Sequence, residues 1–141
     1  MSTVLPVKTP DFLDALHSRV LIGDGAMGTQ LQGFDLDVET DFLGLEGCNE
    51  ILNDTRPDVV AQIHRAYFTA GADLVETNTF GCNLPNLADY NIADRCQELA
   101  YKGTRIARTV ADELGPGRDG MRRFVLGSMG PGTKLPSLGH A

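Results

Sequence analysis

Three short apolar segments of this chain each run into a turn of small and polar residues, and helical patterns separate them. The turns are Gly-Asp-Gly-Ala-Met-Gly-Thr at 23–29, Glu-Thr-Asn-Thr-Phe-Gly at 76–81 and Gly-Ser-Met-Gly-Pro at 127–131. Strands that alternate with helices form right-handed βαβ units, which build a parallel sheet. The carboxyl ends of such strands meet at one edge, where α/β folds place their ligand sites. The sequence therefore predicts an α/β fold whose site lies at these turns.

A helix-start signal stands near the beginning of the chain. Thr9, Pro10 and Asp11 combine a capping hydroxyl, a proline suited to the first helical position and an acid in the first turn. This pattern predicts an N-terminal helix over residues 10–18. Apolar runs bounded by glycine and polar residues predict strands in three ranges, near 20–23, 73–77 and 123–127.

Two longer helices are expected between these strands. Pro57 opens the first, apolar residues recur after it at helical spacing, and Gly71 supplies its stop. The second is expected over residues 93–114. Residues 23–54 form a glycine- and acid-rich connection with little periodicity, and so long a connection in a compact domain is usually functional or disordered.

The predicted elements do not complete a fold of this class. An eight-stranded βα barrel needs about 250 residues, and this chain has 141. A parallel sheet needs helices on both faces, and no helical pattern follows the last predicted strand. We therefore expect residues 1–141 to be the N-terminal portion, three βα units, of a TIM-type (βα)8 barrel, with the N-terminal helix closing its bottom. The rest of the barrel and later domains would be absent. The alternative is a small, complete three-stranded α/β protein.

Composition limits the partners and the compartment of the chain. Apolar residues make up 42% of it and the formal net charge is −7, so it lacks the basic surface that nucleic-acid binding needs. It has no run of about 18 apolar residues, and its N-terminus does not match a secretory signal. Three widely spaced cysteines fit a reducing environment. The sequence predicts a cytoplasmic protein with no nucleic-acid or membrane partner.

The first glycine-rich turn carries one carboxylate, Asp24. Glycine lets a ligand approach main-chain N–H groups, and a carboxylate there suits a cationic group such as an amine. Residues Gly23 to Gly28 also match the dinucleotide fingerprint G-x-G-x-x-G, which belongs to a βαβ unit of about 30 residues. Here the next strand begins about 50 residues later, and Asp24 would repel a pyrophosphate. A substrate-binding turn is favoured over a dinucleotide-binding module or a plain structural turn.

The remaining residues of chemical interest give weaker signals. Cys48, Cys82 and Cys96 are not at the spacing of a locally built zinc site, so we expect no metal site from them. Cys96 is expected in the core, whereas Cys82 follows the second strand and could approach a site. His64 is expected to be a surface or structural residue. For Glu76 a structural ion pair and a catalytic role both stay open.

Most of the chain resembles the homocysteine methyltransferases. Gly-Asp-Gly-Ala-Met-Gly-Thr-Gln-Leu-Gln at 23–32 is similar to the first strand and loop of that family. Residues 70–81 resemble its second strand, and residues 127–136 resemble its third strand and the loop that follows. The likeness extends from residue 10 onward, and its motifs are specific in combination.

Other segments point to one branch of that family. Residues 47–53 and 56–60 resemble the cobalamin-dependent methionine synthases. The segments Cys48-Asn49-Glu50 and Lys134-Leu135-Pro136 favour this branch over the members that use betaine or S-methylmethionine as methyl donor. Those cobalamin-independent enzymes are kept as the alternative within the class.

The resemblance implies a barrel that binds homocysteine and zinc at the carboxyl ends of its strands. Zinc would lower the pKa of the homocysteine thiol, and the thiolate would take a methyl group from methylcobalamin to give methionine. Methyltetrahydrofolate would then remethylate the cobalamin. The family's zinc ligands are three cysteines from late strands, so they are expected beyond residue 141, and this segment would hold neither a catalytic residue nor a bound cofactor.

The resemblance also carries individual residues over to this chain. Asp24 would accept hydrogen bonds from the homocysteine ammonium, and the backbone N–H groups of Gly25 and Ala26 would face its carboxylate. Asn78 and Thr79, at the end of the second strand, are further candidate binding residues. Because the segment would expose the inner barrel face and an unpaired strand edge, it is expected to self-associate or to be poorly stable.

Overall fold

The computed structural model describes residues 11–139, which form a mixed helix and strand fold. Two parallel strands, β1 (Leu74–Glu76) and β2 (Phe124–Leu126), pair with Leu74 opposite Phe124. The parallel pairing agrees with the prediction, and both strands lie within the predicted ranges 73–77 and 123–127. The helical elements are α1 (Phe12–Ser18), α2 (Met27–Leu31), η1 (Asn49–Ile51), α3 (Leu52–Thr55), α4 (Pro57–Ala70), α5 (Leu84–Ala88), η2 (Ala93–Arg95), α6 (Cys96–Leu114), η3 (Arg118–Gly120) and η4 (Pro136–Leu138).

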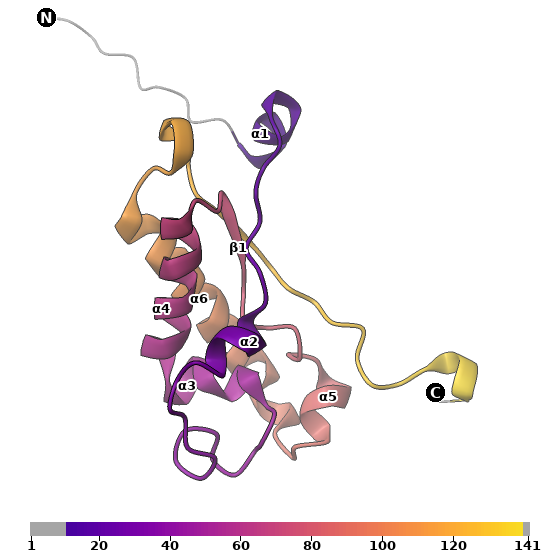
Figure 1. The fold of residues 1–141 in the computed structure, drawn as a ribbon. Helices are drawn as coiled ribbons and strands as arrows, with labels where there is room; N and C mark the ends of the chain where they lie inside the picture. The colour runs from indigo at the N-terminus through magenta and orange to yellow at the C-terminus, as the bar shows by residue number, and fades with distance from the viewer. Residues whose placement is uncertain (1–10, 140–141) are drawn as a thin grey trace, which may run out of the picture.

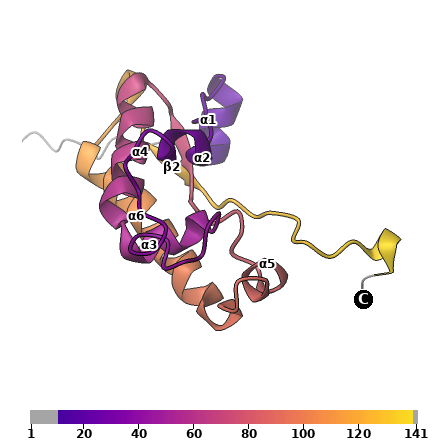
Figure 2. The same ribbon diagram turned by 60° about the horizontal axis from the view of Figure 1, so that its bottom comes forward.

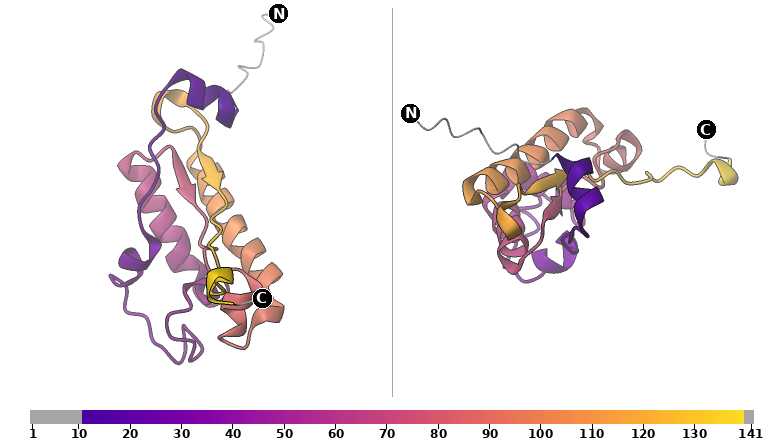
Figure 3. Two further views of the ribbon diagram at one scale, coloured as in Figure 1. Left: turned by 90° about the vertical axis from the view of Figure 1, so that its right-hand side faces the viewer. Right: turned by 90° about the horizontal axis from the view of Figure 1, so that it is seen from above.

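The two long helices, α4 and α6, lie side by side along one face of the strand pair (Figure 1). Between them and β1 lies an apolar cluster that includes Phe68, Val75, Ala107 and Val110. On the opposite face, α1 packs at the amino ends of the strands, where Ala15 and Phe12 share an apolar cluster with Leu74 and Phe124. Figure 3 shows the strands in front of the two long helices. After β2 the chain extends away from the helices and ends in η4 (Figure 2). The long helices therefore cover one side of the strand pair, and α1 packs at the amino ends of the strands on the other side.

The boundaries of α4 follow from the residues at its ends. Pro57 stands in the first turn, where a proline removes no needed hydrogen bond. Gly71 ends the helix with φ 115°, a left-handed conformation that glycine adopts without a Cβ clash. The second predicted helix, over 93–114, is η2 followed directly by α6.

The N-terminal helix begins later than predicted. Its N-cap is Asp11, whose side chain accepts a hydrogen bond from the N–H of Asp14 at 2.9 Å. An aspartate in this position satisfies a helix N–H group directly, and α1 therefore begins at Phe12. Thr9 and Pro10, which were expected to start the helix, lie outside the described residues.

The predicted strand at 20–23 is wrong, because this segment forms no strand ladder. It runs beside β1, but only the carbonyl of Ile22 takes part in backbone pairing, accepting from the N–H groups of Asp73 at 2.7 Å and Leu74 at 3.3 Å. The N–H of Ile22 donates instead to the Asp73 carboxylate at 2.8 Å. A side-chain oxygen thus replaces the backbone partner that a ladder requires.

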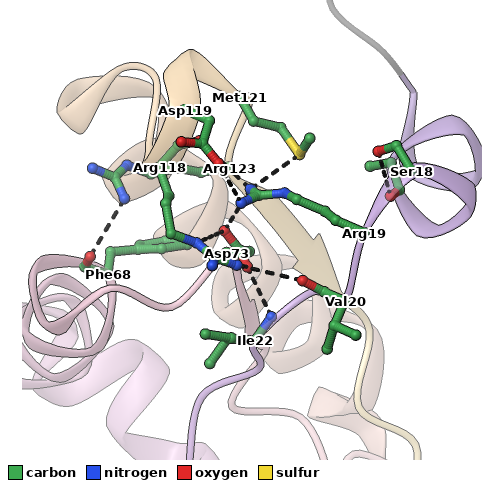
Figure 4. A network of polar contacts seen from close by, with 11 residues as sticks. Ser18, Arg19, Val20, Ile22, Phe68, Asp73, Arg118, Asp119, Met121 and Arg123 are labelled. Carbon is green, nitrogen blue, oxygen red and sulfur yellow. Dashed lines mark hydrogen bonds and ion pairs between the residues drawn. The ribbon is translucent and has the colours of Figure 1, made fainter.

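Asp73 is the centre of an ion-pair network at the amino ends of the strands (Figure 4). Its side chain is 3% exposed and pairs with Arg19 at 2.9 Å and with Arg118, while Arg19 also reaches Asp119 at 2.9 Å. Burial opposes ionisation of Asp73, but hydrogen bonds from Arg118 and Ile22 and the charges of both arginines lower its pKa below the usual value. The network joins the segment before α2 to the turn before β2.

The long connection 23–54 is helical at both ends. It contains α2, then a series of turns, and then η1 and α3. Leu31 and Leu52 from the two ends share one buried cluster with Val60 and Ile63 of α4. This packing places both ends of the connection close to the carboxyl end of β1. Among residues 11–139, none of the helices combines the length and apolar character needed to span a membrane.

Candidate functional site

A cleft of about 420 Å³ opens at the carboxyl ends of β1 and β2. Of the five residues predicted for the site, Asp24, Gly25, Ala26 and Asn78 line it. Residues far apart in the sequence meet there, since the lining comes from the turn before α2, the start of η1 and the ends of both strands. The position at the carboxyl ends of parallel strands is the one expected for α/β ligand sites.

Asp24 is held at the rim of this cleft by the end of β1. Its Oδ2 accepts a hydrogen bond from the N–H of Glu76 at 3.1 Å. Burial raises the pKa of the Asp24 carboxyl; the hydrogen bond from Glu76 opposes this rise, and the negative charge of Glu76 adds to it. A half-buried carboxylate next to a second one gains stability from a cationic partner. Asp24 is therefore suited to bind an ammonium group.

The turn at Gly25 and Ala26 presents unused backbone donors. Within residues 11–139, neither N–H group donates a hydrogen bond. The turn leads into α2, which is only five residues long. A dinucleotide fingerprint needs a full helix at this point, so the geometry does not favour the dinucleotide-binding alternative. Free N–H groups one and two residues from Asp24 can instead receive the carboxylate of a small amphoteric ligand.

Asn78 and Thr79 have different positions relative to the cleft. The Asn78 amide donates to the carbonyl of Asn49 at 2.9 Å and to Oδ1 of Asn53 at 3.0 Å, so both of its donors are used within the protein. Thr79 is buried and does not line the cleft. Its hydroxyl donates to the carbonyl of Ser128 at 2.8 Å. Both side chains join the strand ends to neighbouring segments, and Asn78 also lines the cleft.

Sequence reasoning missed Glu50 as a member of the site. It lines the cleft at 8% exposure, and its Oε1 accepts a hydrogen bond from the N–H of Gly81 at 2.8 Å. With Asp24 and Glu76 it gives the cleft three carboxylates, and no lysine, arginine or histidine among residues 11–139 lines it. The available signal was the Cys48-Asn49-Glu50 segment, but nothing in a single sequence places that loop beside the strand ends.

The surroundings of Glu76 bear on the two roles left open for it, a structural ion pair and a catalytic role. It forms no ion pair with any residue in 11–139, and it lines the cleft. An ion-pair role within this part of the chain is therefore absent. Its backbone N–H holds Asp24, and its side chain adds to the negative charge of the cleft.

The three cysteines gather in one apolar cluster beside the cleft. Cys48 is fully buried, and Cys82 and Cys96 pack against the same group of residues. Burial, with the charge of Glu50 adding to it, raises the pKa of Cys82 to about 12, and burial also raises that of Cys48. Such thiols stay protonated at neutral pH in the metal-free protein. Within residues 11–139, no group of three or more His, Cys, Asp or Glu side chains is arranged to hold a metal ion.

The sequence matches known proteins over nearly its full length. The family model for homocysteine S-methyltransferase matches residues 21–141. The methionine synthase of Mycobacterium tuberculosis is 71% identical over 131 residues, and that of Mycobacterium leprae is 67% identical over 130 residues. Each match covers 92% of this chain and 11% or 10% of the relative. The chain thus spans about a tenth of the length of these curated relatives.

Two solved structures share the fold. They are the oxidized and metallated forms of the homocysteine methyltransferase MmuM from Escherichia coli, with TM-scores of 0.65 and 0.67. The matches cover 82% and 84% of this chain and 39% and 41% of the MmuM chains, at 21% and 23% identity. The extent of the family-model match shows that the chain belongs to the homocysteine S-methyltransferase family.

Proposed function

We propose that this chain is the N-terminal portion of the homocysteine-binding barrel of a cobalamin-dependent methionine synthase. The identity with methionine synthases over 92% of the chain supports this assignment. In this proposal the extended segment 20–23, β1 and β2 take the first three strand positions of a TIM-type (βα)8 barrel. The helices α4 and α6 are the outer helices between them, and the face of β1 and β2 that points away from these two helices is the barrel interior. The cytoplasm is the compartment that the cysteines favour.

The observation that carries the proposal is the anionic cleft at the strand ends. Three carboxylates line it, and none of the described lysine, arginine or histidine residues does. We assign the homocysteine ammonium to Asp24 and the homocysteine carboxylate to the N–H groups of Gly25 and Ala26. Asn78 and Thr79 support this site from beneath through their hydrogen bonds to the neighbouring loops.

The chemistry at the sulfur belongs to parts of the protein beyond the described residues. Zinc, when bound, lowers the pKa of the homocysteine thiol and supplies a thiolate. Residues 11–139 do not fit a zinc site, because they assemble no group of three or more His, Cys, Asp or Glu side chains that could hold the ion. Zinc, cobalamin and methyltetrahydrofolate are therefore assigned to other parts of a longer protein. The chain described here binds and orients the amino-acid end of the substrate.

The gene sequence after residue 141 separates this proposal from its alternative. A late Cys-Cys pair followed by folate- and cobalamin-binding domains supports the methionine synthase. An open reading frame that stops after one barrel supports a homocysteine methyltransferase that uses betaine or S-methylmethionine.

Replacing Asp24 tests the assignment of the amine site. In the full-length enzyme, Asp24→Asn keeps the size of the side chain and removes its charge. The loss of one charge-assisted hydrogen bond costs about 1.5–3 kcal/mol, so the KM for homocysteine should rise about ten- to a hundredfold at unchanged zinc content. Asp35→Asn, at an exposed acid outside the cleft, is the matched control and should leave KM unchanged. An unaltered KM in Asp24→Asn would remove this residue from the site.

The 141-residue chain by itself is expected to self-associate. Val20 is 83% exposed and Met129 is 92% exposed, and both lie next to the strand pair. Within the described residues β2 pairs only with β1, so its other edge is open. Exposed apolar surface and an open strand edge favour association with a second chain. Sedimentation velocity should show oligomers that grow with concentration, and a monomer at every concentration would contradict this expectation.

A further inference from the structure

The turn that we assign to the substrate rests on a tyrosine from α4. The hydroxyl of Tyr67 donates a hydrogen bond to the carbonyl of Ala26 at 2.9 Å. A Cβ placed on Gly25 would lie 2.9 Å from the same hydroxyl and 3.3 Å from ring atom Cε1. A contact below 3.0 Å forces a displacement, so an alanine at position 25 would have to push the Tyr67 hydroxyl aside.

Tyr67 is itself held firmly in place. It lies in the last turn of the 14-residue helix α4, and its ring packs against two of the apolar clusters, those of Ile63 and of Phe68. Its carbonyl accepts the N–H of Ala72 at 3.1 Å, at the point where α4 gives way to β1. The hydroxyl therefore has a fixed position relative to the strand that carries Glu76, which holds Asp24.

The turn has little else to fix its orientation. The N–H groups of Gly25 and Ala26 donate no hydrogen bond to any part of the described chain. Both residues are exposed. A peptide plane without such bonds can rotate, and rotation would turn its N–H group away from the cleft. The carbonyl of Ala26 lies in the next peptide plane, so its hydrogen bond from Tyr67 fixes the Ala26 end of the plane that carries the Ala26 N–H and limits that rotation indirectly.

We propose that Tyr67 is a positioning residue for the amino-acid substrate. Its hydroxyl fixes the turn so that the N–H groups of Gly25 and Ala26 are aimed at the substrate carboxylate before binding. This inference rests on the proposed function, because it concerns the same substrate site. Restraining a binding group in its bound orientation lowers the entropy lost on binding and so raises affinity without a new contact.

The substitution Tyr67→Phe isolates the hydroxyl, because the ring and its packing are retained. In the full-length enzyme the KM for homocysteine should rise about three- to tenfold, the effect of one neutral hydrogen bond. The kcat should change by less than about twofold, because uniform substrate binding is lost while the reacting sulfur is untouched. Tyr101→Phe, on the exposed face of α6, is the matched control and should leave both constants unchanged.

A double substitution tests the contact itself. Gly25→Ala alone should raise KM because its Cβ would press against the Tyr67 hydroxyl. Removing that hydroxyl makes room, so Gly25→Ala combined with Tyr67→Phe should raise KM less than the product of the two single effects. Thermal unfolding of each variant is measured alongside, since a merely structural role would lower the unfolding temperature without this coupling in KM.

The results separate this inference from the proposed function on which it depends. If Asp24→Asn raises KM and Tyr67→Phe does not, the positioning role is wrong and the substrate site stands. If neither substitution changes KM, the proposed substrate site is wrong, and the positioning role is wrong with it. A fall in kcat at unchanged KM for Tyr67→Phe, or fully multiplicative effects in the double variant, would also overturn the positioning role.

Discussion

Replacing Asp73 with asparagine is expected to lower the free energy of unfolding by about 2–4 kcal/mol. The carboxylate is 3% exposed and is shared by Arg19, Arg118 and the N–H of Ile22. Breaking a buried ion pair by removing one partner leaves the other charge without compensation. Arg19 would be affected most, because its side chain is largely buried, whereas Arg118 is exposed enough to regain water.

A matched control exists in the same network. Asp119 pairs with Arg19 at the same distance of 2.9 Å, but its side chain is 75% exposed. Exposed ion pairs contribute at most about 1 kcal/mol, so Asp119→Asn should change stability by less than that. Urea denaturation followed by far-ultraviolet circular dichroism measures both variants. Equal effects of the two substitutions would show that burial does not set the contribution of Asp73.

Local signals in the sequence were enough to predict the helices and the paired strands. Pro57 and Gly71 mark the two ends of α4, because each acts through its own backbone conformation. The parallel pairing of β1 and β2 follows from the helix between them, since a helical crossover connects parallel strands. Such features depend on residues close together in the chain.

The error at 20–23 arose because a distant side chain decided the outcome. The segment 20–23 has the composition of a strand, yet the carboxylate of Asp73, 51 positions after Ile22, takes the N–H that a ladder would use. The start of α1 shifted because the side chain of Asp11 forms the cap. A pattern of apolar residues contains no information on which of several polar groups will satisfy a given N–H.

The candidate site likewise contains residues that the sequence predicted and residues that depend on the folding of distant segments. Asp24 was predicted because a carboxylate between glycines has a clear chemical meaning, and Gly25 and Ala26 were predicted from the resemblance to the homocysteine methyltransferases. All three line the cleft. Glu50 was missed because its place in the cleft depends on how the long connection folds back onto β1. Thr79 was predicted from its position at a strand end, but it is buried below the cleft. Whether these residues bind homocysteine stays a prediction.

His64 should make the stability of the chain fall as the pH drops below neutrality. The side chain is fully buried on α4, and within residues 11–139 neither ring nitrogen has a hydrogen-bond partner. Burial lowers its pKa from 6.5 to about 4, and no neighbouring charge contributes to this shift. The folded protein therefore holds the neutral imidazole, in agreement with the structural role expected from the sequence.

His64 has a pKa of 6.5 in the unfolded chain and of about 4 in the folded chain, and this difference sets the direction of the effect. Above pH 6.5 the imidazole is neutral in both states and adds no pH dependence. As the pH falls from 6.5 towards 4, the unfolded chain takes up the proton and the folded chain does not, so the free energy of unfolding decreases. The full difference is about 3 kcal/mol, of which about 2 kcal/mol is lost by pH 5.

Urea denaturation at pH 7 and pH 5 measures this contribution with little interference from the carboxylates. Asp54 and Glu98, whose folded pKa values are lowered by their partners Lys102 and Arg95, lose their stabilisation mainly at pH values near or below their usual 3.8 and 4.5. The substitution His64→Leu should abolish most of the difference between pH 7 and pH 5, because it removes the buried proton acceptor. His17→Gln, at an exposed position on α1, should leave that difference unchanged. A wild-type chain equally stable at both pH values would mean that His64 is solvated or bonded when protonated.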